Sequence, residues 1–83
     1  MIDLSKYIQD VEDIEFVEYI FTCLEEHYSI DLTYKNNIIH IDYGNPEIYV
    51  DGNKFDDYDE FLLEFILDGK PFISCISEVD FDE

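Results

Sequence analysis

The chain has 83 residues, and its 22 Asp and Glu face only four Lys and no Arg, which gives a formal net charge of −18 at pH 7. Hydrophobic residues still make up 47% of the sequence, with seven Phe and seven Tyr. Disordered acidic segments have few aromatic residues, so this composition excludes a disordered tail. We expect a single globular domain over residues 1–83, without repeats, linkers or an apolar run long enough to span a membrane.

The first part of the chain predicts a short turn followed by a long helix. Asp10 is typical of an N-cap, and Glu12 and Asp13 then lie in the first turn, where the helix dipole favours acids. Apolar residues recur after this cap at spacings of three and four, which predicts an amphipathic helix over residues 11–28. A separate short turn over residues 2–9 is expected to pack one or more apolar side chains on the core. The candidates are Leu4, Tyr7 and Ile8.

Alternation of apolar and polar residues then predicts three antiparallel strands. The first two are expected over residues 30–35 and 38–43, joined by a tight turn in which Asn36-Asn37 supplies two positive φ angles. Gly44-Asn45-Pro46 interrupts the pattern, and a third strand is expected over residues 47–51.

The last third of the chain predicts a second helix and an acidic end. Asp56 or Asp57 is expected to cap a helix over residues 57–68, which a Gly-Lys-Pro sequence would end. A fourth strand at an edge is possible over residues 72–76, and residues 77–83 are expected to form an acidic tail. The fold class is therefore α+β, with two layers built from a helix, a three-stranded antiparallel meander and a helix.

The acidic side chains are the candidate functional residues. Both predicted helices carry like charges three or four positions apart, and each such pair destabilises a helix by a few tenths of a kcal/mol. A net charge of about 2–8 in magnitude suffices for solubility, so −18 favours a surface that binds a strongly basic partner over a plain solvated face. The first predicted helix contributes Glu12, Glu15, Glu18, Glu25 and Glu26.

The densest group of acids precedes and begins the second predicted helix. It consists of Asp51, Asp56, Asp57, Asp59 and Glu60, followed on the helix by Glu64, and Phe55 and Tyr58 lie among these acids. A ring beside carboxylates suits arginine, whose guanidinium stacks on the ring while it bonds the acid. The alternative is that Phe55 packs at the helix start and the aspartates serve as caps. The acidic tail, with Asp80, Asp82 and Glu83, offers a third group.

Metal, cofactor and enzyme functions find little support in the sequence. Asp51-Gly52-Asn53 begins like a calcium loop, but Phe55 and Asp56 occupy positions where that loop needs a ligand and a glycine. The two Cys and two His lack zinc-site spacing, and no nucleophile or phosphate-loop motif occurs. His27 is expected near a helix C-terminus, and His40 on an exposed sheet face. We expect no metal, no cofactor and no enzymatic activity.

The two cysteines and the start of the chain indicate a compartment. Met1-Ile2-Asp3-Leu4 has neither the basic segment nor the apolar run of a secretory signal. Cys23 and Cys75 are therefore expected to be reduced and buried in a cytoplasm, with one disulfide left open as the alternative.

In charge and architecture, the chain resembles the small DNA-mimic inhibitors of phages and mobile elements, among them anti-CRISPR proteins that block Cas9 at its DNA-binding groove. The residues that carry the resemblance are the glutamates of the first predicted helix and the acids around the second. The resemblance implies inhibition, inside a bacterial host cell, of a basic nucleic-acid-binding protein such as a Cas nuclease, without direct binding of nucleic acid or membrane. An immunity or antitoxin-type inhibitor of a nuclease toxin and an acidic interaction adaptor remain open. The sequence fits a monomer or a homodimer.

Overall fold

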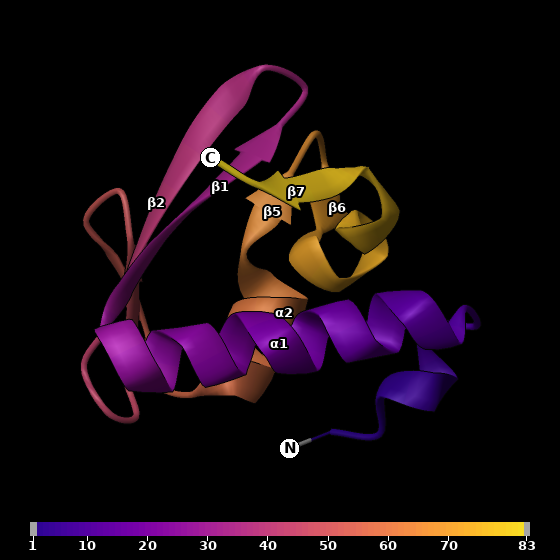
Figure 1. Ribbon diagram of the computed structural model, residues 1–83, viewed down its shortest axis with the longest axis horizontal. Helices are drawn as coiled ribbons and strands as arrows, with labels where there is room; N and C mark the ends of the chain where they lie inside the picture. The colour runs from indigo at the N-terminus through magenta and orange to yellow at the C-terminus, as the bar shows by residue number, and fades with distance from the viewer. Residues whose placement is uncertain (1, 83) are drawn as a thin grey trace.

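The computed structural model describes residues 2–82 and has the predicted α+β class (Figure 1). The two α-helices are α1 (Val11–His27) and α2 (Tyr58–Glu64). The main sheet is antiparallel, with its strands in the order β4 (Asn53–Phe55), β3 (Ile48–Val50), β2 (Asn37–Tyr43), β1 (Ser29–Tyr34) and β7 (Val79–Phe81). A small hairpin pairs β5 (Ile66–Leu67) with β6 (Lys70–Pro71). Three single-turn 3-10 helices complete the chain, η1 (Leu4–Lys6), η2 (Phe72–Ser74) and η3 (Ile76–Glu78).

Helix α1 has the predicted start and nearly the predicted end. The Asp10 side chain accepts a hydrogen bond from the backbone N–H of Glu12 at 2.9 Å, which satisfies one of the unpaired donors of the first turn. The helix ends where Tyr28 takes a left-handed conformation with φ 64°, and the Tyr28 N–H donates to the Leu24 carbonyl. The turn before α1 buries Leu4 and Ile8, whereas Tyr7 is 53% exposed.

The hairpin of β1 and β2 turns one residue earlier than predicted. Lys35 and Asn36, with φ 47° and 67°, occupy the two turn positions expected for Asn36-Asn37. Because both central turn residues lie one position earlier, each β1 residue pairs with a β2 residue two positions earlier than predicted. A shift of two positions leaves each side chain on its predicted face of the sheet. The shift pairs Asp31 with His40, whereas the predicted turn would have paired Asp31 with Asp42.

Helix α2 is shorter than the predicted 57–68. It ends at Glu64, and Phe65 is already extended with φ −78° and ψ 114°. Ending the helix there places the Phe65 ring against Phe61 and Phe72, with centroids 5.5 and 5.7 Å away, while the Phe65 carbonyl accepts from the Phe72 N–H. Asp68 and Gly69 then have positive φ angles and turn β5 into β6.

The C-terminal segments differ most from expectation. Residues 72–76 form η2 and the start of η3 instead of a strand, and the edge strand β7 lies in the segment expected to be an acidic tail. Figure 1 shows β7 beside β1, and the register places Leu32 opposite Phe81. Val79 is buried, Asp80 points outward and Phe81 is half-buried, so the segment has the alternation of a half-buried strand.

A further strand was not predicted. The third strand, expected over residues 47–51, is β3, and Asp51 and Gly52 with φ 50° and 82° form a tight turn into β4. The meander therefore has four strands before α2, and β4 forms one edge of the sheet while β7 forms the other.

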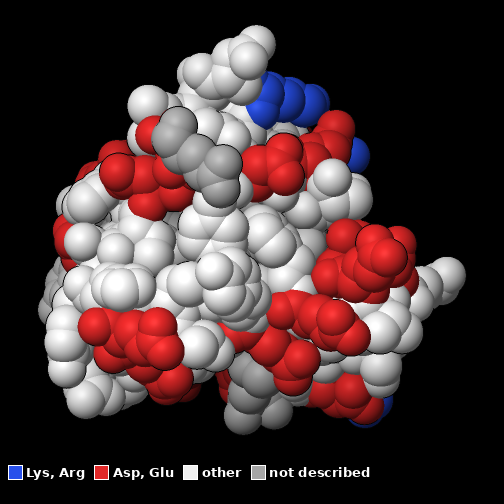
Figure 2. Space-filling view, in the orientation of Figure 1, with Lys and Arg blue, Asp and Glu red and all other residues white. Residues whose placement is uncertain are grey.

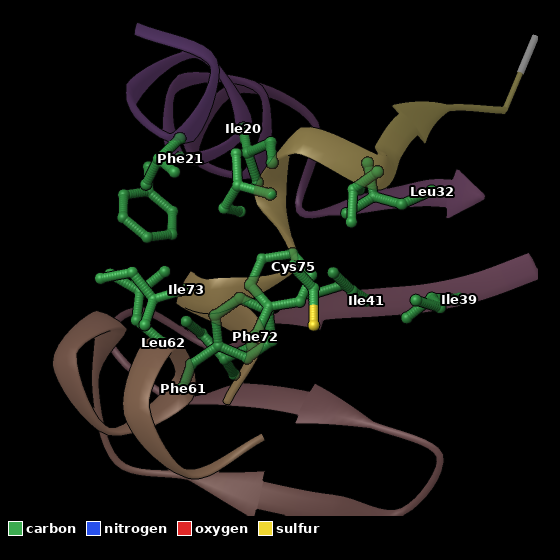
Figure 3. Packing of buried hydrophobic residues seen from close by; sticks show 14 of the residues in the cluster. Ile20, Phe21, Leu32, Ile39, Ile41, Phe61, Leu62, Phe72, Ile73 and Cys75 are labelled. Carbon is green, nitrogen blue, oxygen red and sulfur yellow. The ribbon is translucent and has the colours of Figure 1, made fainter. Parts of the chain in front are cut away.

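One apolar core joins these elements. Figure 3 shows side chains from α1, α2, the sheet and the 3-10 segment converging, with Phe61 and Phe72 among the fully buried ones. Both cysteines are free and buried, as expected. The sheet therefore has one covered face and one exposed face, which bears Asp31, His40 and Asp42.

The first prediction tests whether β7 is part of the fold. Val79 is only 3% exposed, so Val79→Ala should lower the free energy of unfolding by about 2 kcal/mol through lost burial and a small cavity. Urea unfolding measures this without adding ions that screen the surface charge. Asp80→Ala, on the same strand but exposed, is the control and should leave stability unchanged or raise it. Equal, small effects of both variants would mean that β7 is not packed on the core.

Candidate functional site

The acidic side chains of the described residues all reach the surface. None of the Asp and Glu in residues 2–82 is buried. In Figure 2 they form several separate groups around a centre without acids, on the face that α1 crosses. Only two ion pairs with lysine occur within residues 2–82, Lys35 with Asp68 at 2.9 Å and Lys54 with Asp56 at 3.8 Å. Most of the negative charge of the described surface therefore has no lysine to balance it.

The five glutamates predicted on α1 are all exposed and form what we call the α1 stripe. They are Glu12, Glu15, Glu18, Glu25 and Glu26. At 3.6 residues per turn they lie within a sector of roughly 140° and extend along about 21 Å of helix. Within the described residues, none of them pairs with a lysine, and the one ion pair of the stripe joins Glu26 to His27 at 3.8 Å.

The acids around the start of α2, which we call the α2 cluster, have local structural roles. The cluster consists of Asp51, Asp56, Asp57, Asp59 and Glu60. Asp57 is the N-cap and accepts from the Glu60 N–H at 2.9 Å, while the Glu60 carboxylate accepts from the Asp56 N–H. Asp59 accepts from the Ile2 N–H at 2.8 Å and so ties down the N-terminal segment. Three of the five carboxylates thus stabilise the fold, in line with the capping alternative.

The two aromatic residues within the α2 cluster are packed into the protein. Phe55 is 9% exposed and contacts Phe61 and Phe65, with ring centroids 5.8 and 6.0 Å away. Tyr58 is half-buried and stacks between Phe21, at 3.9 Å, and Tyr43, at 5.6 Å. The expectation that these two rings offer a face to arginine is therefore wrong, because each ring already packs against others.

The hydroxyl group of Tyr58 is buried. It has no hydrogen-bond partner within the described part of the chain, and burial raises its pKa, with the nearby Tyr43 and Glu25 adding to the shift.

Glu64, at the other end of α2, is exposed. The predicted site residues with exposed side chains are thus those of the α1 stripe, Asp51, Asp56, Asp57 and Glu64.

His40 is part of a cluster that the sequence reasoning missed. On the open face of the sheet, its Nδ1 lies 2.6 Å from Asp31 Oδ1 and its Nε2 lies 3.0 Å from Asp42 Oδ1. The pKa of His40 is raised, chiefly by the Asp31 hydrogen bond and further by Asp42, against a smaller opposing effect of burial. The sequence could have indicated Asp42 as a neighbour of His40, because it lies two positions along the same strand. Asp31 could be identified as the second neighbour only with the correct position of the turn between β1 and β2.

An open cavity of about 420 Å³ lies between α1, the first half of β1 and the end of β7. Its walls include Tyr19 and Phe81, whose ring centroids are 5.3 Å apart, and the acids Asp31 and Asp82. Sequence reasoning missed this cavity because it placed Phe81 and Asp82 in an acidic tail and predicted no strand there. Of that third acidic group, Asp80 and Asp82 are exposed on and after β7, and Glu83 lies outside the described residues.

No group of three or more His, Cys, Asp and Glu within residues 2–82 is arranged to hold a metal ion. No helix of this range is both long and apolar enough to cross a bilayer. No family model matches the chain, and neither the curated proteins nor the solved structures include a match.

The second prediction separates capping from charge in the α2 cluster. Asp57→Ala removes the N-cap of α2 and should lower the free energy of unfolding by about 1 kcal/mol. Asp56→Ala removes the same charge from the neighbouring exposed position and serves as the matched control, with little expected loss. Urea denaturation of both variants in the same buffer measures the difference. Equal unfolding midpoints would contradict the capping role.

The third prediction concerns the titration of His40. Its Cε1–H resonance should titrate above the ordinary histidine pKa of about 6.5, and Asp31→Asn should bring the midpoint down. Because the pKa is raised in the folded state, the pair stabilises the fold below the unfolded-state pKa, and this contribution is lost as the pH rises through the folded-state value. The stability difference between wild type and His40→Gln should shrink over the same interval. An unchanged titration in Asp31→Asn would refute the pairing.

Proposed function

We propose that the protein is an acidic DNA mimic that inhibits a nucleic-acid-binding protein in the bacterial cytoplasm by occupying its basic groove. The observation that carries this proposal is the combination of a packed core with a surface charge that lysine does not balance. Charge of one sign on a compact body opposes folding by self-repulsion, and solubility requires far less of it. The cationic side chains of a basic partner would neutralise these like charges, so binding would relieve the repulsion.

The α1 stripe supports the proposal by its charge density. Five glutamates along about 21 Å of helix compare with about six phosphates along the same length of one DNA strand, at 3.4 Å per phosphate. The stripe is attached to the core through the opposite face of α1, where Val17, Ile20 and Leu24 are fully buried. Because the helix backbone is fixed, the carboxylates keep their spacing without the cost of ordering a disordered segment.

The mechanism is competition for cationic side chains. Much of a DNA-binding protein's affinity comes from lysine and arginine that neutralise phosphates, and the same side chains can pair with carboxylates. Opposite charges also steer the two proteins together, so association should be fast and should weaken steeply with added salt. The carboxylates contain no bond that a nuclease could cleave in place of a phosphodiester, so the groove is filled without turnover.

The fourth prediction tests the α1 stripe with two variants of equal charge. Changing Glu12, Glu15, Glu18, Glu25 and Glu26 to Gln lowers the net charge from −18 to −13. The control variant makes the same change to five acids elsewhere, Glu47→Gln, Asp51→Asn, Asp56→Asn, Glu64→Gln and Glu78→Gln. A basic protein captured from bacterial lysate on the immobilised wild type should be released by short duplex DNA, and its affinity should fall by at least tenfold more in the stripe variant.

Each outcome of this experiment decides a point. Release by duplex DNA at constant ionic strength supports competition for a DNA groove. Equal losses in both variants would mean that total charge or the acids around α2, and not the stripe in particular, determine binding. Capture of one nuclease that duplex DNA does not release would favour the immunity-type inhibitor, and capture of a protein without a nucleic-acid-binding groove would favour the acidic adaptor. Either of the last two results overturns the mimic.

A further inference from the structure

We propose that the cavity between α1, β1 and β7 is an anchoring pocket for one arginine side chain of the partner protein. The proposal rests on the proposed function for the nature of the partner, whereas the pocket itself is argued from its own geometry. Its volume of about 420 Å³ lies within the range of pockets that bind small ligands. A long side chain from a docked protein therefore has room to enter.

The pocket exists because β7 covers only part of β1. The pairing runs from Leu32 with Phe81 to Tyr34 with Val79, and one more hydrogen bond joins the Asp82 N–H to the Asp31 carbonyl. Ser29 and Ile30 lie beyond this pairing and line the pocket between the end of β7 and α1. The opening therefore lies where the sheet leaves the start of β1 unpaired.

The lining combines an aromatic wall with carboxylates, which suits a guanidinium group. Tyr19 and Phe81 lie edge to face with centroids 5.3 Å apart, and Phe81 also makes an edge contact with Phe16 at 5.5 Å. Asp31 and Asp82 also line the pocket and supply acceptors. Arginine stacks its planar group on rings while its donors reach carboxylates, and its methylene stem packs on apolar walls.

Arginine fits better than lysine for two physical reasons. The ammonium group of lysine is a strongly hydrated point charge, whereas guanidinium is more weakly hydrated and enters an aromatic-lined site at lower cost. Guanidinium also donates in several directions from one plane, so it can bond two neighbouring carboxylates at once. The α1 stripe lacks this selectivity, because exposed glutamates attract either cation.

One histidine of the lining, His40, sets the pH of the test. His40 shares Asp31 with the pocket, and its other nitrogen bonds Asp42 on the sheet, while His27 lies at the end of α1 near Glu26. A protonated imidazole would compete with guanidinium for the same carboxylate. Because Asp31 raises the pKa of His40 above the ordinary histidine value of about 6.5, the binding experiment is run at about pH 8.5 to reduce the protonated fraction of His40.

The fifth prediction uses N-acetyl-arginine amide as the probe. Titrated into the 15N-labelled protein at moderate salt, it should shift amide resonances of residues 29–31 and 81–82 first, with an affinity at least threefold higher than that of N-acetyl-lysine amide. Asp82→Asn should weaken arginine binding by at least threefold, because it removes one pocket carboxylate. Asp80→Asn, the matched control, removes the same charge from β7, two residues before Asp82 and outside the pocket, and should have little effect.

The outcomes separate the pocket from the mimic. Shifts spread over all the acids, equal affinity for the two probes or equal losses in Asp82→Asn and Asp80→Asn would overturn the pocket. If the probe binds as expected but no DNA-competable partner is captured, the mimic fails and the arginine pocket stands. If a partner is captured and Asp82→Asn binds it as well as wild type does, the pocket is not its anchor.

Discussion

The packing of phenylalanine and isoleucine between the sheet and the helices is the interaction on which the rest of this structure depends. An 83-residue chain buries only part of its surface, and here like charges at −18 oppose compaction. Phe61 and Phe72 lie at the centre, and rings at positions 55 and 65 surround them. Because this core is apolar throughout, with no buried charge among residues 2–82, the carboxylates are all left to the surface.

The same core explains which elements could be predicted from the sequence. Helix α1 has 17 residues, a cap and a clear apolar period, so its own pattern determines it. The strands β1 and β2 have strict alternation, and a two-residue error in register leaves their faces unchanged. In contrast, β4 to β7 have two or three residues each. Such segments take their conformation from tertiary packing, which no local pattern reveals.

Phe65 illustrates the limit. Its spacing from Phe61 continues a helical stripe, and nothing nearby in the sequence ends the helix before Gly69. In the fold, the helix ends at Glu64, the Phe65 ring packs against Phe72, and the segment that follows forms the β5–β6 hairpin. The Asp68 carboxylate then accepts hydrogen bonds from Tyr34 and Lys35, 34 and 33 residues away. These contacts follow from where two distant segments meet, which the sequence pattern alone does not contain.

The candidate site divides in the same way between what a pattern reveals and what only the fold creates. The exposure of the α1 stripe follows from helical periodicity, and the capping role of Asp57 was one of two alternatives that the sequence left open. The pocket exists because β7 ends at Phe81, beside the uncovered start of β1, and the sequence pattern did not indicate this strand end.

The difference between the stripe and the pocket has a functional consequence under the proposed mechanism. An exposed stripe of carboxylates attracts any basic groove, so charge supplies affinity and speed. A single shaped pocket instead fixes one register on one groove. Selectivity for one partner among many basic proteins would then depend less on the number of acids than on Phe81 and Asp82, at the end of a strand that only the folded protein forms.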